Sequence, residues 1–188
     1  MSDEYTKEEK LELLKLARHT IENYVKTREK EYSVTSNSKF LENRGVFVTL
    51  HKGKELRGCI GYPLPVKSLI QAVVDNAIAA SFEDPRFNSV KLEELKNIDI
   101  EISILTVPKE QENIHKIKIG RDGIIITKGF MRGLLLPQVP VEQGWNLVEY
   151  ISYGCMKAGL SEDEWKRGVK IETFQADVFN EKETLEEK

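Results

Sequence analysis

The residues of this sequence whose chemistry stands out are Arg57 and Cys59, two positions apart in the segment Leu-Arg-Gly-Cys-Ile-Gly at 56–61. Cysteine reacts as the thiolate, and a neighbouring arginine favours that charged form. An arginine can also grip a carboxylate or phosphate with its planar guanidinium. We interpret Cys59 as a candidate nucleophile or thiol donor, and Arg57 as the residue that activates it or binds an anionic group. The alternative is that Cys59 is a small buried core residue, as free cysteines commonly are.

Two glycines and an isoleucine complete the candidate site. Glycine weakens a strand and often marks a place where a ligand or another backbone comes close. We therefore assign Gly58, Ile60 and Gly61 to a ligand-binding surface. The same glycines could also mark a bulge or a tight turn where no side chain fits.

A second group with possible chemistry is Asp-Pro-Arg-Phe at 84–87. Asp84 and Arg86 could line a groove together with Arg57, and we retain both as candidate ligand-binding residues. The structural alternative is favoured by ordinary turn chemistry, because aspartate before proline is common in turns and Arg86 could simply pair with Asp84.

A general base for Cys59 is harder to find. A Cys–His pair needs hydrogen-bond reach. His51 flanks a predicted turn and is expected on the face opposite Cys59, while His19 and His115 lie in other segments. The sequence has no zinc-type spacing and no phosphate-binding loop of the Walker type. It therefore predicts no metal site and leaves any cofactor open.

Two predicted strands position the thiol. Residues 46–50 and 55–60 are rich in strand formers, and Lys52-Gly53 can form the tip of a hairpin between them. In that register Cys59 lies opposite Val46 and Arg57 opposite Val48. Arg57 and Cys59 then share one face, because side chains alternate along a strand. A one-residue bulge would break this register.

The other predicted elements indicate an α+β fold, mainly an antiparallel sheet with flanking helices. Helices are predicted from a capping box at Thr6 and Glu9 to about Lys30, and over residues 67–82. The alternation of isoleucines predicts a half-buried strand at Ile98–Leu105. The segments 117–119 and 124–127 are predicted to pair as a hairpin, residues 169–178 to form one last strand, and residues 180–188 a mobile tail. Cys155, within an amphipathic helix, is expected in the core.

Composition limits the classes of partner and the cellular compartment that we expect. The chain has 188 residues, 28 basic and 31 acidic, for a net charge of −3, so nucleic acid is an unlikely partner. No apolar run is long enough to span a bilayer, and we expect no membrane partner. Two cysteines make no disulfide framework, and the first residues lack the apolar segment of a secretory signal, so we expect a cytoplasmic protein. The oligomeric state is left open.

Taken together, these motifs resemble the AMMECR-one family, and the resemblance covers most of the chain. It implies one domain over residues 1–188 with an α+β fold. Within this domain a main lobe and a small second lobe would enclose a groove near residues 56–61. Microbial members often occur together with Memo-like and radical-SAM proteins, which implies shared chemistry. The protein would then be a thiol-dependent enzyme, or a catalytic partner in that pathway, acting on a small molecule or a modified residue. The alternative is a non-catalytic adaptor whose groove binds a peptide or partner protein. The segments that carry the resemblance are 45–50, 56–61, 84–87, 100–106, 120–123, 135–139, 144–145 and 157–160.

Overall fold

The computed structural model describes residues 5–186 and divides into two compact units. One unit contains the chain up to Leu105 together with the residues from Asp177 onward, and the other is Thr106–Ala176. Each unit has its own four-stranded antiparallel sheet and its own helices, which confirms the α+β class. No helix in the described part of the chain combines the length and apolarity needed to cross a membrane.

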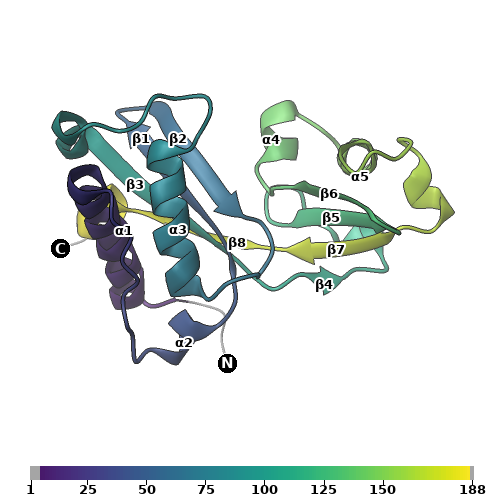
Figure 1. Cartoon of the computed structure of the whole chain (residues 1–188). Helices are drawn as coiled ribbons and strands as arrows, with labels where there is room; N and C mark the ends of the chain where they lie inside the picture. Colours follow the sequence, from purple (N-terminus) through teal and green to yellow (C-terminus); the bar gives the residue numbers. More distant parts are fainter. Residues whose placement is uncertain (1–4, 187–188) are drawn as a thin grey trace. The chain divides into compact units, whose positions relative to one another are not determined.

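The sheet of the first unit has the strand order β2-β1-β3-β8, so β2 is an edge strand. Helices α1 and α3 lie on one face of this sheet (Figure 1). They cover the alternate strand residues Val46, Val48 and Leu50, which are fully buried. The elements of this unit are α1 (Lys7–Thr27), α2 (Ser38–Leu41), β1 (Gly45–Lys52), β2 (Glu55–Tyr62), α3 (Leu69–Phe82), a 3-10 helix (Leu92–Asn97), β3 (Ile98–Leu105), β8 (Ala176–Asn180) and α6 (Glu181–Glu186).

The sheet of the second unit has the order β4-β7-β5-β6. Helix α5 packs on β5 and β6, and Tyr150 and Cys155 of this helix are completely buried. The expectation that Cys155 belongs to the core is confirmed. The elements of this unit are β4 (Lys109–Glu110), a 3-10 helix (Ile114–Lys116), β5 (Gly123–Lys128), β6 (Met131–Leu135), α4 (Val139–Gln143), α5 (Leu147–Lys157), a 3-10 helix (Glu164–Arg167) and β7 (Lys170–Phe174).

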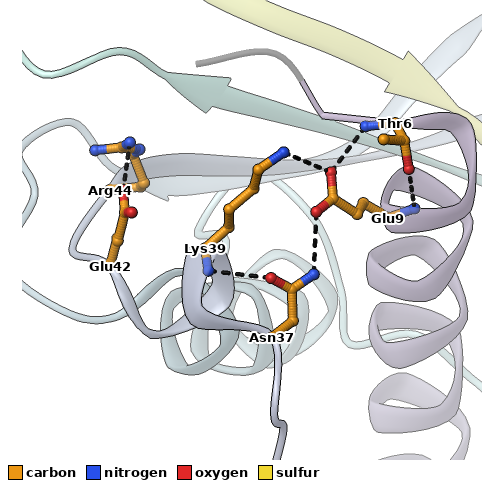
Figure 2. Close-up of polar contacts among 6 residues, drawn as sticks. All are labelled: Thr6, Glu9, Asn37, Lys39, Glu42 and Arg44. Atoms are coloured by element: carbon orange, nitrogen blue, oxygen red, sulfur yellow. Dashed lines mark hydrogen bonds and ion pairs between the residues drawn. The ribbon is translucent and has the colours of Figure 1, made fainter. Parts of the chain in front are cut away.

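The predicted capping box at the start of α1 is present, and it has a second role (Figure 2). The Glu9 carboxylate accepts a hydrogen bond from the Thr6 amide at 2.8 Å, while the Thr6 hydroxyl accepts one from the Glu9 amide. The same carboxylate receives Asn37 Nδ2 at 3.1 Å and Lys39 Nζ at 3.0 Å. Glu9 therefore ties the start of α1 to α2, the helix that leads into β1.

The predicted register of the β1–β2 hairpin is wrong. Lys52 pairs with Glu55, so the tip is Gly53-Lys54, and Gly53 takes the left-handed φ of 65° that favours glycine. A bulge follows, because His51 pairs with Leu56 while Leu50 pairs with Gly58, which leaves Arg57 without a partner residue on β1. As a result Cys59 lies opposite Thr49, and not opposite Val46.

Three other expectations also need correction. The hairpin joins β5 to β6 through Gly129-Phe130, and residues 117–119 form no strand. The single strand expected over 169–178 is two strands, β7 in the second sheet and β8 in the first. Residues 181–186 of the expected tail form α6, where the Glu181 carboxylate accepts hydrogen bonds from Arg18 and from the Ile100 amide. Residues 187 and 188 of that tail lie outside the described residues.

Candidate functional site

The two segments singled out from the sequence meet at Cys59. Strand β2 is an edge strand, and both backbone groups of Cys59 bind the segment 84–86. Asp84 Oδ2 accepts a hydrogen bond from the Cys59 amide at 2.9 Å, and Arg86 Nη2 donates one to the Cys59 carbonyl at 3.2 Å. One carboxylate and one guanidinium thus hold both sides of the thiol-bearing residue.

Asp84 is the fixed point of this arrangement. Its side chain is buried, and it accepts hydrogen bonds from Arg86 Nε at 2.9 Å, Arg86 Nη2 at 2.7 Å and the Arg86 amide at 3.1 Å. The Arg86 guanidinium above all, and then the Cys59 amide, hold the pKa of Asp84 well below its usual range, against the opposing effect of burial. The carboxylate is therefore ionised. The pairing of Arg86 with Asp84 that turn chemistry predicted is present, and the same carboxylate also binds the Cys59 amide.

The Cys59 thiol has one hydrogen-bond partner within the sheet. Cys59 is half-buried, and the hydroxyl of the buried Thr49 donates a hydrogen bond to its Sγ at 3.3 Å. Asp84 raises the pKa of the Arg86 guanidinium. Arg86, whose side chain is 54% exposed, contacts Cys59 through the carbonyl oxygen of that residue.

Arg57 has a different environment from the one expected. Its Nε and Nη2 each donate a hydrogen bond of 3.1 Å to the Glu94 carboxylate, and only 13% of its side chain is exposed. This contact with Arg57 is the main reason why the pKa of Glu94 is lowered. The role of Arg57 in activating Cys59 stays a prediction, while its guanidinium is bound to a carboxylate on a 3-10 helix.

The glycines of the segment are packed closely. A Cβ on Gly58 would lie 2.1 Å from the Ala80 carbonyl oxygen of α3, and one on Gly61 would lie 2.4 Å from the Phe47 ring. The Ile60 side chain packs against the core of the first unit. Internal packing therefore explains these three residues by itself, and their contact with a ligand stays a prediction.

Three polar residues on the face that carries Cys59 were missed or misplaced by the sequence analysis. Thr49 lies between Cys59 of β2 and Glu101 of β3, because it is paired with both. His51 shares the face of Thr49, and its Nε2 lies 3.9 Å from Glu101 Oε2. Burial raises the pKa of Glu101, an effect that His51 partly opposes. The alternation of β1 and β3 contained the signal, but the bulge at Arg57 concealed that Cys59 belongs to the same face.

A metal site finds no support in these side chains. The described residues contain no group of three or more His, Cys, Asp or Glu arranged to hold a metal ion.

Comparison with known proteins shows which family the chain belongs to. It is 50% identical over 188 residues to Protein MJ0810 of Methanocaldococcus jannaschii, covering 95% of this chain and 92% of that protein. It is 45% identical over 193 residues to Protein MK0488 of Methanopyrus kandleri, covering 97% and 93%. The crystal structure of the uncharacterized protein PH0010 from Pyrococcus horikoshii has the same fold, with a TM-score of 0.77, 44% identity, and coverage of 90% of this chain and 89% of that one. The AMMECR1 family pattern matches residues 14–179, and the chain therefore belongs to the AMMECR1 family.

Proposed function

We propose that this protein is a thiol-dependent enzyme, or a catalytic partner in a multi-protein pathway, that binds a small molecule at residues 56–61. Cys59 would act as the nucleophile or thiol donor. The observation that carries the proposal is the setting of its sulfur, which accepts a hydrogen bond from the Thr49 hydroxyl at 3.3 Å, while Arg86 binds the carbonyl of the same residue. A hydroxyl donor favours the thiolate, which is the form that attacks electrophiles.

Rigidity of the strand adds support. Asp84 and Arg86 fix the backbone on both sides of Cys59, and Asp84 in turn fixes Arg86 through two side-chain hydrogen bonds. A reacting group held in place by such contacts loses little freedom when a substrate arrives. His51 and Glu101, on the same face of the sheet, are the candidate groups for proton transfer.

The adaptor alternative is less favoured by the same contacts. Peptides often bind by adding a strand to the exposed edge of a sheet. At Cys59 both backbone groups of the edge strand already bind Asp84 and Arg86. Addition of a peptide strand at this point would have to displace an ion pair, whereas a small molecule beside the thiol would not.

Alkylation of the native protein tests the proposal. Mass spectrometry after brief exposure to iodoacetamide at pH 7 reports Cys59 and Cys155 separately, and the completely buried Cys155 is an internal control. We expect Cys59 to be modified at least tenfold faster than Cys155, a ratio that corresponds to about 1.4 kcal/mol. Modification of Cys59 only after the protein is unfolded in urea would overturn the proposal.

A further inference from the structure

A polar pocket of about 520 Å³ lies beside the bulge of β2, within the first unit. Four basic and two acidic residues line it, although the whole chain carries a net charge of −3. Asp84 does not line the pocket but forms an ion pair with Arg86, so it offsets one of the positive charges. Local positive charge still exceeds negative charge here. These charged lining residues are Lys52, Arg57, Arg86, Lys91, Glu93 and Glu94.

Arg57 forms the rigid part of this pocket. Two of its three guanidinium nitrogens bind Glu94, and Glu94 is itself held by the Lys91 amide at 3.1 Å. The third nitrogen, Nη1, is buried and makes no hydrogen bond with any described residue. Glu94 therefore fixes the Arg57 guanidinium in the wall of the pocket.

Arg86 supplies the second, more exposed cation. Its guanidinium lies over the Phe87 ring, with Cζ 5.5 Å from the ring centroid, and Asp84 fixes its Nε and Nη2. Asn88 and Ser89 add neutral polar groups to the same lining. Planar guanidinium groups, a ring and neutral donors suit an oxyanion carried on a small organic body.

We infer that this pocket binds the phosphate or carboxylate group of a small molecule, with Arg57 and Arg86 as the anchoring residues. The inference deepens the proposed function and rests on it for the role of Cys59. Arg86 also binds the Cys59 carbonyl, so an anion held by Arg86 is anchored next to the strand residue that bears the thiol. Glu93 and Glu94 oppose the entry of highly charged polyanions, which favours a small ligand over a nucleic-acid backbone.

Titration of the full chain with inorganic phosphate, pyrophosphate and citrate tests the inference, with ionic strength kept constant by sodium chloride. Isothermal calorimetry or protein NMR reports the affinity. We expect saturable binding of at least one of these anions, and the preferred anion distinguishes a phosphate ligand from a carboxylate ligand. We expect Arg57→Lys, which keeps the charge but cannot bind Glu94 through two nitrogens, to weaken anion binding at least tenfold, and Arg86→Gln to weaken it severalfold.

Lys54→Gln is the matched control, because Lys54 is exposed at the tip of the same hairpin and does not line the pocket. The control is expected to bind as the wild type does. If Arg57→Lys does not fold, as judged by circular dichroism, Arg86→Gln and Lys91→Gln decide the outcome. Absence of saturable binding for all three anions would overturn the inference, as would an equal loss in Lys54→Gln, which would indicate unspecific charge attraction.

Alkylation of Cys59 and titration with anions, both on the wild-type protein, separate this inference from the proposed function. Anion binding together with an inert Cys59 would support the pocket and overturn the thiol chemistry. A reactive Cys59 without anion binding would support the thiol chemistry and overturn the pocket.

Discussion

The amide of Cys59 donates a hydrogen bond of 2.9 Å to Asp84, a residue 25 positions further along the chain. This contact joins the strand that carries the thiol to the turn that ends helix α3. Arg86 completes the connection by binding both the Asp84 carboxylate and the Cys59 carbonyl. The candidate site is therefore built from the contact between two short segments.

Replacing Asp84 with asparagine should destabilise the protein. The neutral amide has no negative charge and one acceptor oxygen instead of two, so it keeps only part of the hydrogen bonds from Arg86. Hydrogen bonds to charged groups contribute about 1.5–3 kcal/mol each to stability. Because Arg86 is partly exposed, we expect Asp84→Asn to cost about 2 kcal/mol in total, measured by urea denaturation. Glu83→Gln, an exposed neighbour, is the control. Equal stabilities of the two variants would show that the hydrogen bonds of the Asp84 carboxylate contribute nothing to stability.

Gly58→Ala should be strongly destabilising because α3 packs directly on this residue. The added Cβ would lie 2.1 Å from the Ala80 carbonyl oxygen, a backbone atom that moves only if the helix moves. Overpacking of this kind costs about 1–3 kcal/mol. Leu56→Ala on the same strand, where the side chain is 40% exposed, should cost less than about 1 kcal/mol. Thermal denaturation of both variants checks the difference, and a neutral Gly58→Ala would contradict the close packing.

Acid should weaken the first unit through Asp75. Burial would raise the pKa of Asp75, but hydrogen bonds from Lys30, Lys67 and Tyr32 outweigh it and lower the pKa below the ordinary value of 3.8. Above pH 3.8 the stabilisation is therefore fully present. It is lost as the pH falls toward the lower pKa of the folded state, because the unfolded chain binds the proton first.

Denaturation in urea between pH 2.5 and pH 7 measures this effect. We expect Asp75→Asn to be less stable than the wild type at pH 7, with a shallower loss of stability in acid. Parallel curves for the two proteins would mean that Asp75 does not contribute to the acid sensitivity. Because the Tyr62 hydroxyl also donates to Asp75, the variant should also loosen the end of β2.

Thr49→Val should slow the alkylation of Cys59. Valine keeps the shape of threonine but removes the hydroxyl that donates to Sγ. A hydrogen bond contributes about 1 kcal/mol, which corresponds to roughly a fivefold change in rate. Thr49→Ser, which keeps the hydroxyl, should react nearly as the wild type does. Identical rates for valine and serine at position 49 would show that the hydroxyl does not act on the sulfur.

Patterns along the chain predicted the elements well where one face of each element is buried. The alternating isoleucines of β3 are buried as expected, at positions 98, 100, 102 and 104. The capping residues Thr6 and Glu9 start α1 as expected. These features depend on neighbours in sequence, so local propensity is sufficient to predict them.

The predictions that were wrong, namely the hairpin register and the residues facing Cys59, depend on the position of a single residue. Gly53 occupies the first position of the hairpin tip, where its positive φ is needed, and a bulge then adds Arg57. The shifted tip moves the pairing by two residues and the bulge moves it by one more, so Cys59 lies opposite Thr49 and not opposite Val46. The one-residue step at the bulge changes which side chains of β1 share a face with Cys59. The sequence therefore predicted that Cys59, Asp84 and Arg86 belong to one site, but it placed His51 on the wrong face and gave Arg57 the wrong neighbour.

The hydrogen bonds of Asp84 and Arg86 to the Cys59 backbone also limit the pairing of this edge strand with other chains. An uncovered edge strand is a template on which other chains can assemble into extended sheets. Asp84 and Arg86 occupy the donor and acceptor of β2 at Cys59 with charged side chains. At Cys59 the outermost strand of this sheet therefore has neither a free donor nor a free acceptor with which another strand could pair.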